Sequence, residues 1–444
     1  MSGAAPAYRA FTAATLDSIP QLEGLSASRL LAMRAVAQVL PFRTNPYVTE
    51  ELIDWSNIPA DPIFQLTFPQ PGMLEPADLG TMTGLLRSGA PQQEIRAAAD
   101  RIRLKLNPHP AGQLEHNVPR LDGVPLPGLQ HKYRQTVLFF PGRGQTCHAY
   151  CTYCFRWAQF VGMEGLKFAQ RETATFHEYL RRHTEVSDVL FTGGDPLIMR
   201  AWHLRAYMRP LLEPEFEHLR QIRIGTKALA FWPRKFVTDP DADSLLRLFE
   251  RVVASGKHLA LMAHFTHPRE LDTPVVRKAI ERIRSTGAVI RTQAPLVRHV
   301  NDSATAWAEM WREQVRLGCV PYYMFVERDT GPKGYFEVPL ATAHDIYRRA
   351  FRQVTGLART VRGPSMSATP GKVVVLGTQE VHGEKVFILG FIRARNREWV
   401  GRPFFARFDP QATWLDHLRP AFGARRFFFE EEEDERPSRA IAWE

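Results

Sequence analysis

Three of the cysteines lie close together on one short stretch, Gln145 to Arg156. Cys147, Cys151 and Cys154 follow the spacing C-x3-C-x2-C, directly after an apolar run from Val137 to Phe140. Because that run is typical of a strand, we expect the thiols to lie at its carboxyl end. Three thiolates can bind three irons of a [4Fe–4S] cluster and leave the fourth iron open for chemistry.

Two other uses of these cysteines stay open. A single zinc ion would need a fourth ligand, which His148 or a distant histidine could supply. A disulfide is disfavoured, because four cysteines in 444 residues without an apparent signal peptide are typical of a reduced cytoplasmic protein. Cys319, at the edge of an expected strand, is interpreted as a buried small apolar residue.

The composition is that of a globular protein, with 44% hydrophobic and 23% charged residues. No apolar run reaches 18 residues, so we expect no membrane span. The formal charge of +10 permits nucleic-acid binding, but no Lys/Arg tract interleaved with aromatic residues supports it. We expect most arginines on solvated helix faces and some around an anionic cofactor or substrate.

The elements that would position the cysteines begin after an accessory region. Residues 1–130 predict a helix from about Leu30 to Leu40, capped by Ser26 or Ser28, and a second helix from about Pro91 to Leu106. Between these helices, and again before residue 130, the sequence is rich in proline. We expect both proline-rich stretches to be extended connectors.

Residues 131–345 alternate between short apolar runs and helical patterns. This order predicts an α/β fold, a partial (β/α)6 TIM-like barrel with an N-terminal helical layer and a C-terminal α/β extension over 346–444. Two helices are expected to end at Gly256 and Gly287. The expected parallel strands are Val137 to Phe140, Asp188 to Thr192, Gln221 to Thr226, His258 to His264, Ala288 to Gln293 and Pro321 to Val326.

Polar or glycine residues follow most of these strands. Each has an ordinary explanation, since a Gly-Gly-Asp sequence is a common turn and a lone histidine is usually structural. Together they would converge on the carboxyl edge of the barrel, where such folds place their sites. The residues are Gly193, Gly194, Asp195, Lys227, His264 and Gln293.

The sequence also resembles a known family. The motif CHAYCTYC, followed by GGDP after the next strand, resembles the radical S-adenosylmethionine enzymes. Over about residues 40–400 the chain is similar, in order, to the lysine 2,3-aminomutase family. The matching segments are FRTNPY, PGLQHKYRQTVLFFP, FTGGDPL, RIGTKALAFWPRKF, HFTHPRE, TQAPLVRHVND, PYYMF and PGK.

The resemblance implies two cofactors besides the cluster held by the three cysteines. Gly193, Gly194 and Asp195 would line the S-adenosylmethionine site. His264 and Gln293 match positions close to the adenosyl group and to the second cofactor, pyridoxal 5'-phosphate.

The resemblance also implies roles for residues outside the strand ends. Lys372, in SATPGK, is the candidate for the lysine that holds pyridoxal phosphate. Lys132, Tyr133 and Lys227 match positions near the cofactor's phosphate. Arg156 matches the arginine that takes the substrate carboxylate, where a planar guanidinium can form paired hydrogen bonds.

The activity implied is a radical 2,3-aminomutase, an isomerase that moves an amino group from the α- to the β-carbon of an amino acid. Its partners would be a small amino acid substrate and a reductant such as flavodoxin or ferredoxin, in the cytoplasm and away from membranes. The aromatic-rich segments ATWLDHL and RRFFF could form a homodimer contact, or could be buried within their own domain.

The chain departs from the family where lysine-specific members hold the substrate's ε-ammonium with two aspartates. One position is Arg328, with Asp329 one place away, and the other falls near Ser365. The reversed charge predicts an acidic or polar substrate such as glutamate. If Asp329 points inward instead, lysine or arginine stays open as the substrate.

The approach to Lys372 also departs from the family, because the usual run of glycines is replaced by SMSATPG. If Lys372 is an ordinary surface group, the enzyme would lack pyridoxal phosphate. It would then act on another substrate, such as a protein lysine or a natural-product intermediate. A third possible function is that of a zinc-binding module without catalytic activity.

The C-terminal part predicts a helix followed by a hairpin over the barrel mouth. Its strands are expected at Lys372 to Leu376 and Lys385 to Ile392, with Gly383 in the turn. The acidic run from Glu430 to Glu435 is expected to be a frayed tail.

Overall fold

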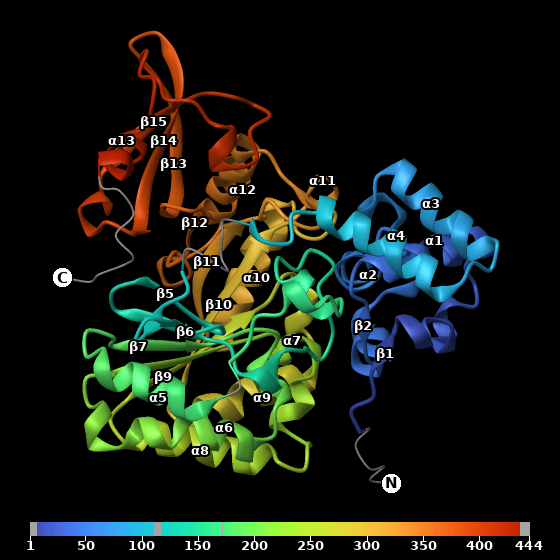
Figure 1. The fold of residues 1–444 in the computed structure, drawn as a ribbon, viewed down its shortest axis with the longest axis horizontal. Helices are drawn as coiled ribbons and strands as arrows, with labels where there is room; N and C mark the ends of the chain where they lie inside the picture. The colour runs from blue at the N-terminus through green and yellow to red at the C-terminus, as the bar shows by residue number, and fades with distance from the viewer. Residues whose placement is uncertain (1–6, 111–116, 171, 436–444) are drawn as a thin grey trace.

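An eleven-stranded sheet organises the molecule in the computed structural model, which describes residues 7–110, 117–170 and 172–435 (Figure 1). The strand order is β15-β14-β13-β12-β11-β10-β9-β8-β7-β6-β5. The α/β class is therefore confirmed. Within the described ranges, no helix is both long and apolar enough to cross a membrane.

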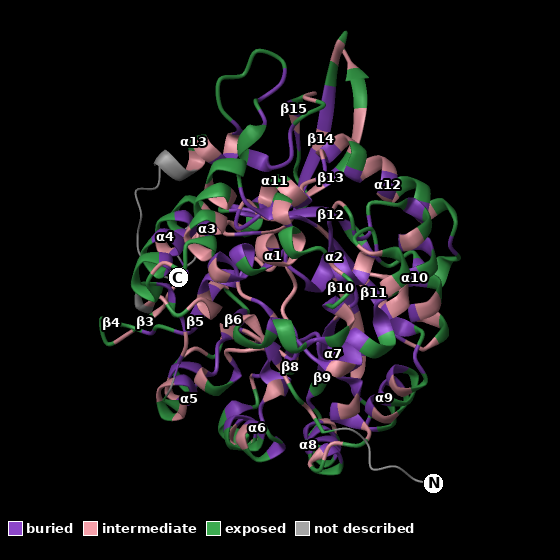
Figure 2. Cartoon of the chain, turned by 90° about the vertical axis from the view of Figure 1, so that its right-hand side faces the viewer, coloured by how far each residue is buried: buried purple, intermediate pink, exposed green. Residues whose placement is uncertain are grey.

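Strands β6 to β11 are parallel and neighbour one another in sequence order, as predicted. Helices connect them on the outside, where their outward faces are exposed and the strands are buried (Figure 2). The sheet is open, because β6 also pairs with β5, and β11 with β12. The strands are β6 (Thr136–Phe139), β7 (Asp188–Phe191), β8 (Gln221–Thr226), β9 (His258–His264), β10 (Val289–Leu296) and β11 (Val320–Val326).

The connecting helices end where glycine allows a positive φ. Gly256 (φ +83°) and Gly287 (φ +84°) follow α8 and α9, as expected. The helices are α5 (Thr173–Arg182), α6 (Ala201–Met208), α7 (Ala228–Phe231), α8 (Ala242–Ala254), α9 (Pro274–Ser285) and α10 (Ala304–Arg316).

The N-terminal region forms a lobe beside the sheet (Figure 1). As expected, Ser26 caps its first helix, accepting from the Arg29 amide at 3.3 Å. The prediction of an extended stretch is wrong in part, because Pro62 and Pro76 each begin a helix. At the first position of a helix, the missing N–H of proline costs no hydrogen bond. The elements are β1 (Phe11–Thr12), α1 (Ala27–Val39), β2 (Arg43–Thr44), α2 (Pro62–Thr67), α3 (Pro76–Arg87) and α4 (Gln92–Lys105).

The second connector is also more regular than predicted. A small hairpin, β3 (Arg120–Leu121) with β4 (Val124–Pro125), precedes β5 (Leu129–Tyr133). Strand β5 pairs antiparallel with β6 and adds an edge to the main sheet. Its sequence, LQHKY, lacks the apolar character that marks a strand.

The C-terminal part extends the same sheet. Strand β12 pairs parallel with β11, and the predicted hairpin follows with Gly383 (φ +75°) in its turn. Strands β12 and β15 were not predicted, because GPS in β12 and the short β15 resemble loop sequence. The elements are α11 (Lys333–Phe336), α12 (Leu340–Arg352), β12 (Arg362–Ser367), β13 (Gly371–Val381), β14 (Glu384–Ala394) and β15 (Pro403–Arg407).

The acidic segment at the end is helical rather than frayed. It belongs to α13 (Phe428–Glu435), and a carboxylate oxygen of Glu432 accepts from the Trp399 indole nitrogen at 2.6 Å. The aromatic segments that could have formed a dimer contact are buried within their own domain. Trp414, Leu415, Phe427 and Phe429 join one apolar core with β13 and β14.

Candidate active site

The cysteine loop follows β6 and is held by the N-terminal lobe. The amide of Tyr150 donates to the carbonyl of Arg43 at 2.8 Å, and the Asn45 side-chain amide donates to the carbonyl of His148 at 3.1 Å. Because both partners lie near β2, the accessory region fixes the path of the loop. The lobe is therefore part of the site's scaffold.

The three cysteines are free and partly buried. A single zinc ion holds its thiolate sulfurs about 4 Å apart. Over the described ranges, the group of three potential ligands whose atoms all lie within 4.8 Å of one another is His131, His183 and Glu185, without any cysteine. The wider spacing of Cys147, Cys151 and Cys154 suits a multi-iron cluster better than one zinc ion.

Burial raises the pKa of all three thiols, to about 11 for Cys154 and about 12 for Cys151. Nearby thiols and the carboxylates of Asp195, Glu270 and Glu327 add to this effect. A thiol must lose its proton to bind iron, so cluster binding and proton release are coupled here.

The Gly193–Gly194 pair packs directly against this loop. Gly193 has φ +132°, and a Cβ there would lie 2.3 Å from the Gln145 amide nitrogen. A Cβ on Gly194 would lie 2.5 Å from the backbone nitrogen of Thr146. Both missing side chains therefore make room for the residues just before Cys147, a contact that the sequence did not predict.

Asp195 ties the glycine turn to the end of β8. Its carboxylate accepts from the Thr226 hydroxyl at 2.8 Å and from the amides of Leu197 and Lys227 at 2.9 and 2.8 Å. Its own amide donates to the carbonyl of Thr146 at 2.7 Å. The side chain is 2% exposed, so these internal bonds occupy it.

Lys227 lies next to the cysteine loop, in a buried ion pair with Glu270. Its Nζ is 2.7 Å from Glu270 Oε1 and 3.0 Å from the Thr266 hydroxyl, and it opposes the burial effect on the pKa of Cys151. The sequence had associated Lys227 with the cofactor phosphate. Its charge is balanced within the protein by Glu270, and the association with the phosphate stays a prediction.

His264 ends β9, and its register partner Gln293 lies within the neighbouring strand β10. The Gln293 amide nitrogen lies 2.7 Å from Nε2 of His264. Burial, with Lys227 and Arg156 nearby, lowers the pKa of His264 to about 3. The ring is therefore neutral at ordinary pH, and the contact between the two side chains is one that the sequence did not predict.

Arg156 and Arg328 lie against the same aromatic ring. Their guanidinium carbons are 4.9 and 5.0 Å from the centroid of Phe155. Nη1 of Arg156 and Nε of Arg328 are buried without a hydrogen-bond partner among the described residues. Burial, opposed by Cys154 and assisted by Arg328, lowers the pKa of Arg156 to about 9.

Carboxyl groups next to Arg328 leave this charge only partly balanced. Oδ1 of Asp329 is buried and makes no hydrogen bond within the described ranges, while its backbone carbonyl accepts from Asn107 at 2.6 Å. Glu327 is 4% exposed, and burial raises its pKa well above the usual range. The sequence had not singled out Glu327, which is recognisable only from its burial at the end of β11.

Lys372 begins β13 and points its Nζ at two aromatic rings, 4.0 Å from the Tyr323 centroid and 4.7 Å from that of Phe325. It has no carboxylate partner within the described ranges. Burial, with Arg393 and other arginines nearby, lowers the pKa of Lys372 to about 7. It is therefore not an ordinary surface lysine, and its amine can be neutral near pH 7.

Several basic residues surround Lys372, and three of them, Arg393, Arg223 and Arg362, had not been singled out from the sequence. Arg393 is its register partner on β14, and its guanidinium lies 4.2 Å from the Tyr133 centroid. Lys132 donates to the carbonyl of Ala368 at 2.6 Å. Pairing in the β13–β14 hairpin is the signal that could have placed Arg393 here. The other arginines that lower the pKa of Lys372 are Arg223, Arg362 and Arg328.

Comparison with known proteins supports the resemblance. No family model matches the chain. It is 32% identical to a protein named putative L-lysine 2,3-aminomutase from Aquifex aeolicus, over 86% of the chain and 89% of that protein. It is also 30% identical to L-lysine 2,3-aminomutase from Escherichia coli, over 55% of the chain and 68% of that protein.

Among solved structures, the chain is similar to a radical SAM methyltransferase from Sphaerobacter thermophilus. The identity is 15%, the TM-score is 0.36, and the match covers 54% of this chain and 68% of that one. The sequence relatives, rather than this likeness, decide the assignment. With its three-cysteine loop and its glycine turn, the chain belongs to the radical S-adenosylmethionine, lysine 2,3-aminomutase-like family of enzymes.

Proposed function

We propose that this enzyme moves the α-amino group of an acidic amino acid to its β-carbon, with pyridoxal phosphate on Lys372. The observation that carries the substrate proposal is the pair of buried guanidiniums on Phe155, each with an unpartnered nitrogen. A buried cation without a partner is costly, so both positions favour an anionic ligand. A dicarboxylic amino acid offers one carboxylate to Arg156 and one to Arg328.

Lys372 supports the pyridoxal phosphate part of the proposal. Its buried amine has no carboxylate partner among the described residues and can be neutral near pH 7, as imine formation requires, and the surrounding arginines suit a phosphate. When bound, pyridoxal phosphate supplies a π system through which an amino group can migrate. In this chain we assign its phosphate to Lys132, Tyr133 and Arg393 rather than to Lys227, whose charge Glu270 already neutralises.

The cluster and S-adenosylmethionine would lie between the cysteine loop and the ends of β7, β9 and β10. Family membership implies both cofactors, which together supply a carbon radical when an electron is delivered. We assign S-adenosylmethionine to the backbone of Gly193 and Gly194 and to the His264–Gln293 pair. Asp195 would act indirectly, because it holds the glycine turn.

The wider architecture is proposed on the same basis. We infer that β6 to β11 form an incomplete barrel, which agrees with their placement around the centre of the molecule in Figure 2. The domains would be 1–130, 131–345 and 346–444, although the sheet is continuous across the last boundary. A flavodoxin or ferredoxin would deliver the electron.

A second candidate substrate is lysine. It is favoured by the buried, unpartnered Oδ1 of Asp329 and by the names of the relatives. In that case Asp329 would bind the ε-ammonium, and Arg328 would serve another group.

A product assay on the reconstituted enzyme distinguishes the two. Reduced enzyme with S-adenosylmethionine and pyridoxal phosphate is given glutamate, aspartate, lysine or arginine, and β-amino acids are detected by mass spectrometry. We expect a β-amino acid from an acidic substrate and a loss of that preference in Arg328→Asp. Conversion of lysine alone, unchanged in Arg328→Gln, would overturn the acidic-substrate proposal.

The lysine assignment has its own test, independent of turnover. The unmutated protein with pyridoxal phosphate should show the visible absorbance of an enzyme-bound imine, and borohydride should fix the cofactor to Lys372. Lys372→Ala should lose both signals, whereas Lys385→Ala, on the same hairpin, should keep them. Labelling of another lysine would refute the assignment.

A further inference from the structure

A groove with a volume of about 680 Å³ lies between α6 and α8. Its wall includes Trp202, whose side chain is 61% exposed, a large fraction for tryptophan. Exposed aromatic residues with a polar surround are typical of docking surfaces. The lining residues are Ala201, Trp202, Arg205, Ser244, Arg247, Leu248, Glu250, Arg251 and Ala254.

The charge of this face is strongly positive. Three exposed arginines line the groove, a fourth lies over the ring of Trp202, and two more flank α6 in the sequence; none of the six forms an ion pair with a carboxylate among the described residues. Glu250 is the acidic residue of the lining. The six are Arg143, Arg200, Arg205, Arg209, Arg247 and Arg251.

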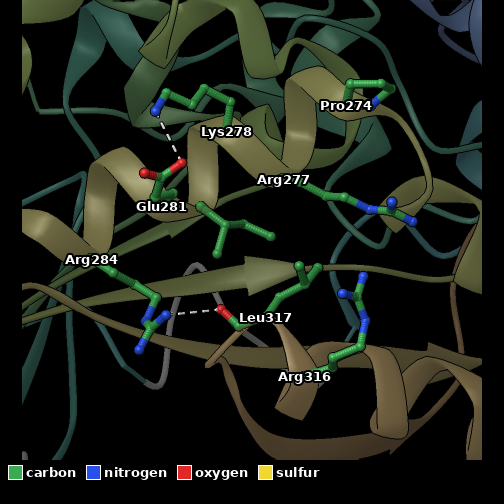
Figure 3. A pocket seen from close by; sticks show the side chains of 8 residues that line it. Pro274, Arg277, Lys278, Glu281, Arg284, Arg316 and Leu317 are labelled. Carbon is green, nitrogen blue, oxygen red and sulfur yellow. Dashed lines mark hydrogen bonds and ion pairs between the residues drawn. The ribbon is translucent and has the colours of Figure 1, made fainter.

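A second groove, beside α9, shows that arginines without a carboxylate partner are not general on this surface. It has a volume of about 530 Å³, and Figure 3 shows the Lys278 ammonium directed at Glu281. Lys278 lies 3.0 Å from Glu281, and Arg277 lies 3.6 Å from Glu313. Arg284 donates to the carbonyl of Leu317 at 3.3 Å, much as Arg251 of the first groove donates to the carbonyl of Arg247 at 3.2 Å, so the difference between the grooves lies in their ion pairs with carboxylates. The α6–α8 face therefore differs in the state of its charges.

The α6–α8 face also contacts the segment that leads into the cysteine loop. Arg143, four residues before Cys147, has Nη1 2.7 Å from Nε2 of His203 and its guanidinium carbon 5.9 Å from the Trp202 ring centroid. The next residue, Gly144, packs so tightly that a Cβ would lie 3.3 Å from Pro196. A protein bound over Trp202 would therefore lie against the segment that carries the cluster.

We propose that this face binds the enzyme's electron donor, a small acidic carrier protein with a flavin or an iron–sulfur cluster. Arginines without carboxylate partners, grouped around an exposed aromatic residue, complement an acidic surface and accelerate the encounter of the two proteins. One electron leaves the reduced carrier and enters the cluster, and no covalent bond forms. The proposal rests on the family's need for a reductant and is independent of the substrate and of Lys372.

The test measures reduction of the cluster itself. The reconstituted protein is mixed anaerobically with reduced bacterial flavodoxin, or in a second arm with reduced ferredoxin, and loss of cluster absorbance gives the rate. Reduction by dithionite is measured in parallel. The ratio of the carrier rate to the dithionite rate corrects for any change in cluster content.

We expect Arg205→Glu/Arg251→Glu to lower that ratio about 10-fold or more with either carrier, and to remove its salt dependence. The control, Arg277→Glu/Arg316→Glu, makes the same charge change in the groove beside α9 and should leave the ratio within twofold. An unchanged ratio in the first variant, or an equal loss in the control, would overturn the proposal. If the protein is not an aminomutase, these reduction rates still decide the question.

Discussion

The two sides of the candidate site handle buried charge in opposite ways. Near the glycine turn, Asp195 accepts several internal hydrogen bonds, and Lys227 is paired with Glu270. Near the expected substrate and second cofactor, Arg156 and Arg328 keep unpartnered buried nitrogens, and Lys372 has no carboxylate partner in the described part of the chain.

The difference separates scaffold from binding surface. The first side is electrostatically complete, so it can hold the cysteine loop in place before any ligand arrives. The second side is stabilised when anions neutralise it, and therefore binding free energy is available there. Charged residues that match motifs of the same family can therefore have different roles, because some hold the cysteine loop and others bind a ligand.

The largest effect is expected where both sides meet, at the cysteine loop. Cys151→Ala should reduce bound iron to near background and abolish turnover, because a [4Fe–4S] cluster needs three thiolates here. Iron and sulfide analysis after anaerobic reconstitution checks this. Cys319→Ala, which alters a buried cysteine outside the loop, should keep full iron content.

The next largest effect is expected at the Lys227–Glu270 ion pair, on the side where the buried charges are paired. Glu270→Ala leaves the Lys227 ammonium buried and unpaired, and should lower the free energy of unfolding by about 3–5 kcal/mol. The double variant Lys227→Met/Glu270→Leu should recover most of this loss. Chemical denaturation measures both, and equal loss in the single and double variants would contradict the ion-pair account.

The side that carries Arg328, where buried charges lack partners, should respond differently to substitution. Arg328→Gln removes a partly unpartnered buried cation, so stability should stay the same or rise. Binding of an acidic substrate should weaken by about 1.5–3 kcal/mol, or roughly 10- to 150-fold in kcat/KM, as for a lost charged hydrogen bond. A clear loss of stability without a change in kcat/KM would mean that Arg328 belongs to the scaffold.

The smallest expected effect is a pH dependence centred on Lys372, whose side chain keeps partial contact with solvent. Its pKa falls from 10.5 to about 7 on folding, so the unfolded chain binds more protons between these values. Stability should therefore rise with pH across that window in the protein without pyridoxal phosphate. Lys372→Met should flatten the rise, and an identical profile in wild type and variant would contradict it.

The sequence predicted the parallel strands well because their apolar runs are short and bounded by polar residues. Strands β8 and β9 have the expected bounds, whereas β10 runs from Val289 to Leu296, beyond the expected end at Gln293. Strand β5 was missed because it is an edge strand without an apolar sequence, and β12, although interior to the sheet, was missed because its Gly-Pro-Ser sequence is typical of a loop.

The site was less predictable because side-chain partners depend on tertiary packing. Lys227 lies at a conspicuous strand end, yet only the folded chain shows that Glu270 neutralises it. Arg393 lies far from every motif, and hairpin register alone brings it opposite Lys372. Residue type and spacing located the reactive edge, whereas the balance of charges required the contacts.

The close packing of Gly193 and Gly194 against Gln145 and Thr146 has a consequence for engineering. A larger residue at Gly194 would meet the loop backbone at Thr146, and one at Gly193 would displace the Gln145 side chain and strain a backbone at φ +132°, so the radical-forming part tolerates little redesign. Arg328 and Ser365, on the β11 and β12 side, make none of those contacts. Substrate preference could therefore be diversified in a library at that end while the iron-binding loop keeps its sequence.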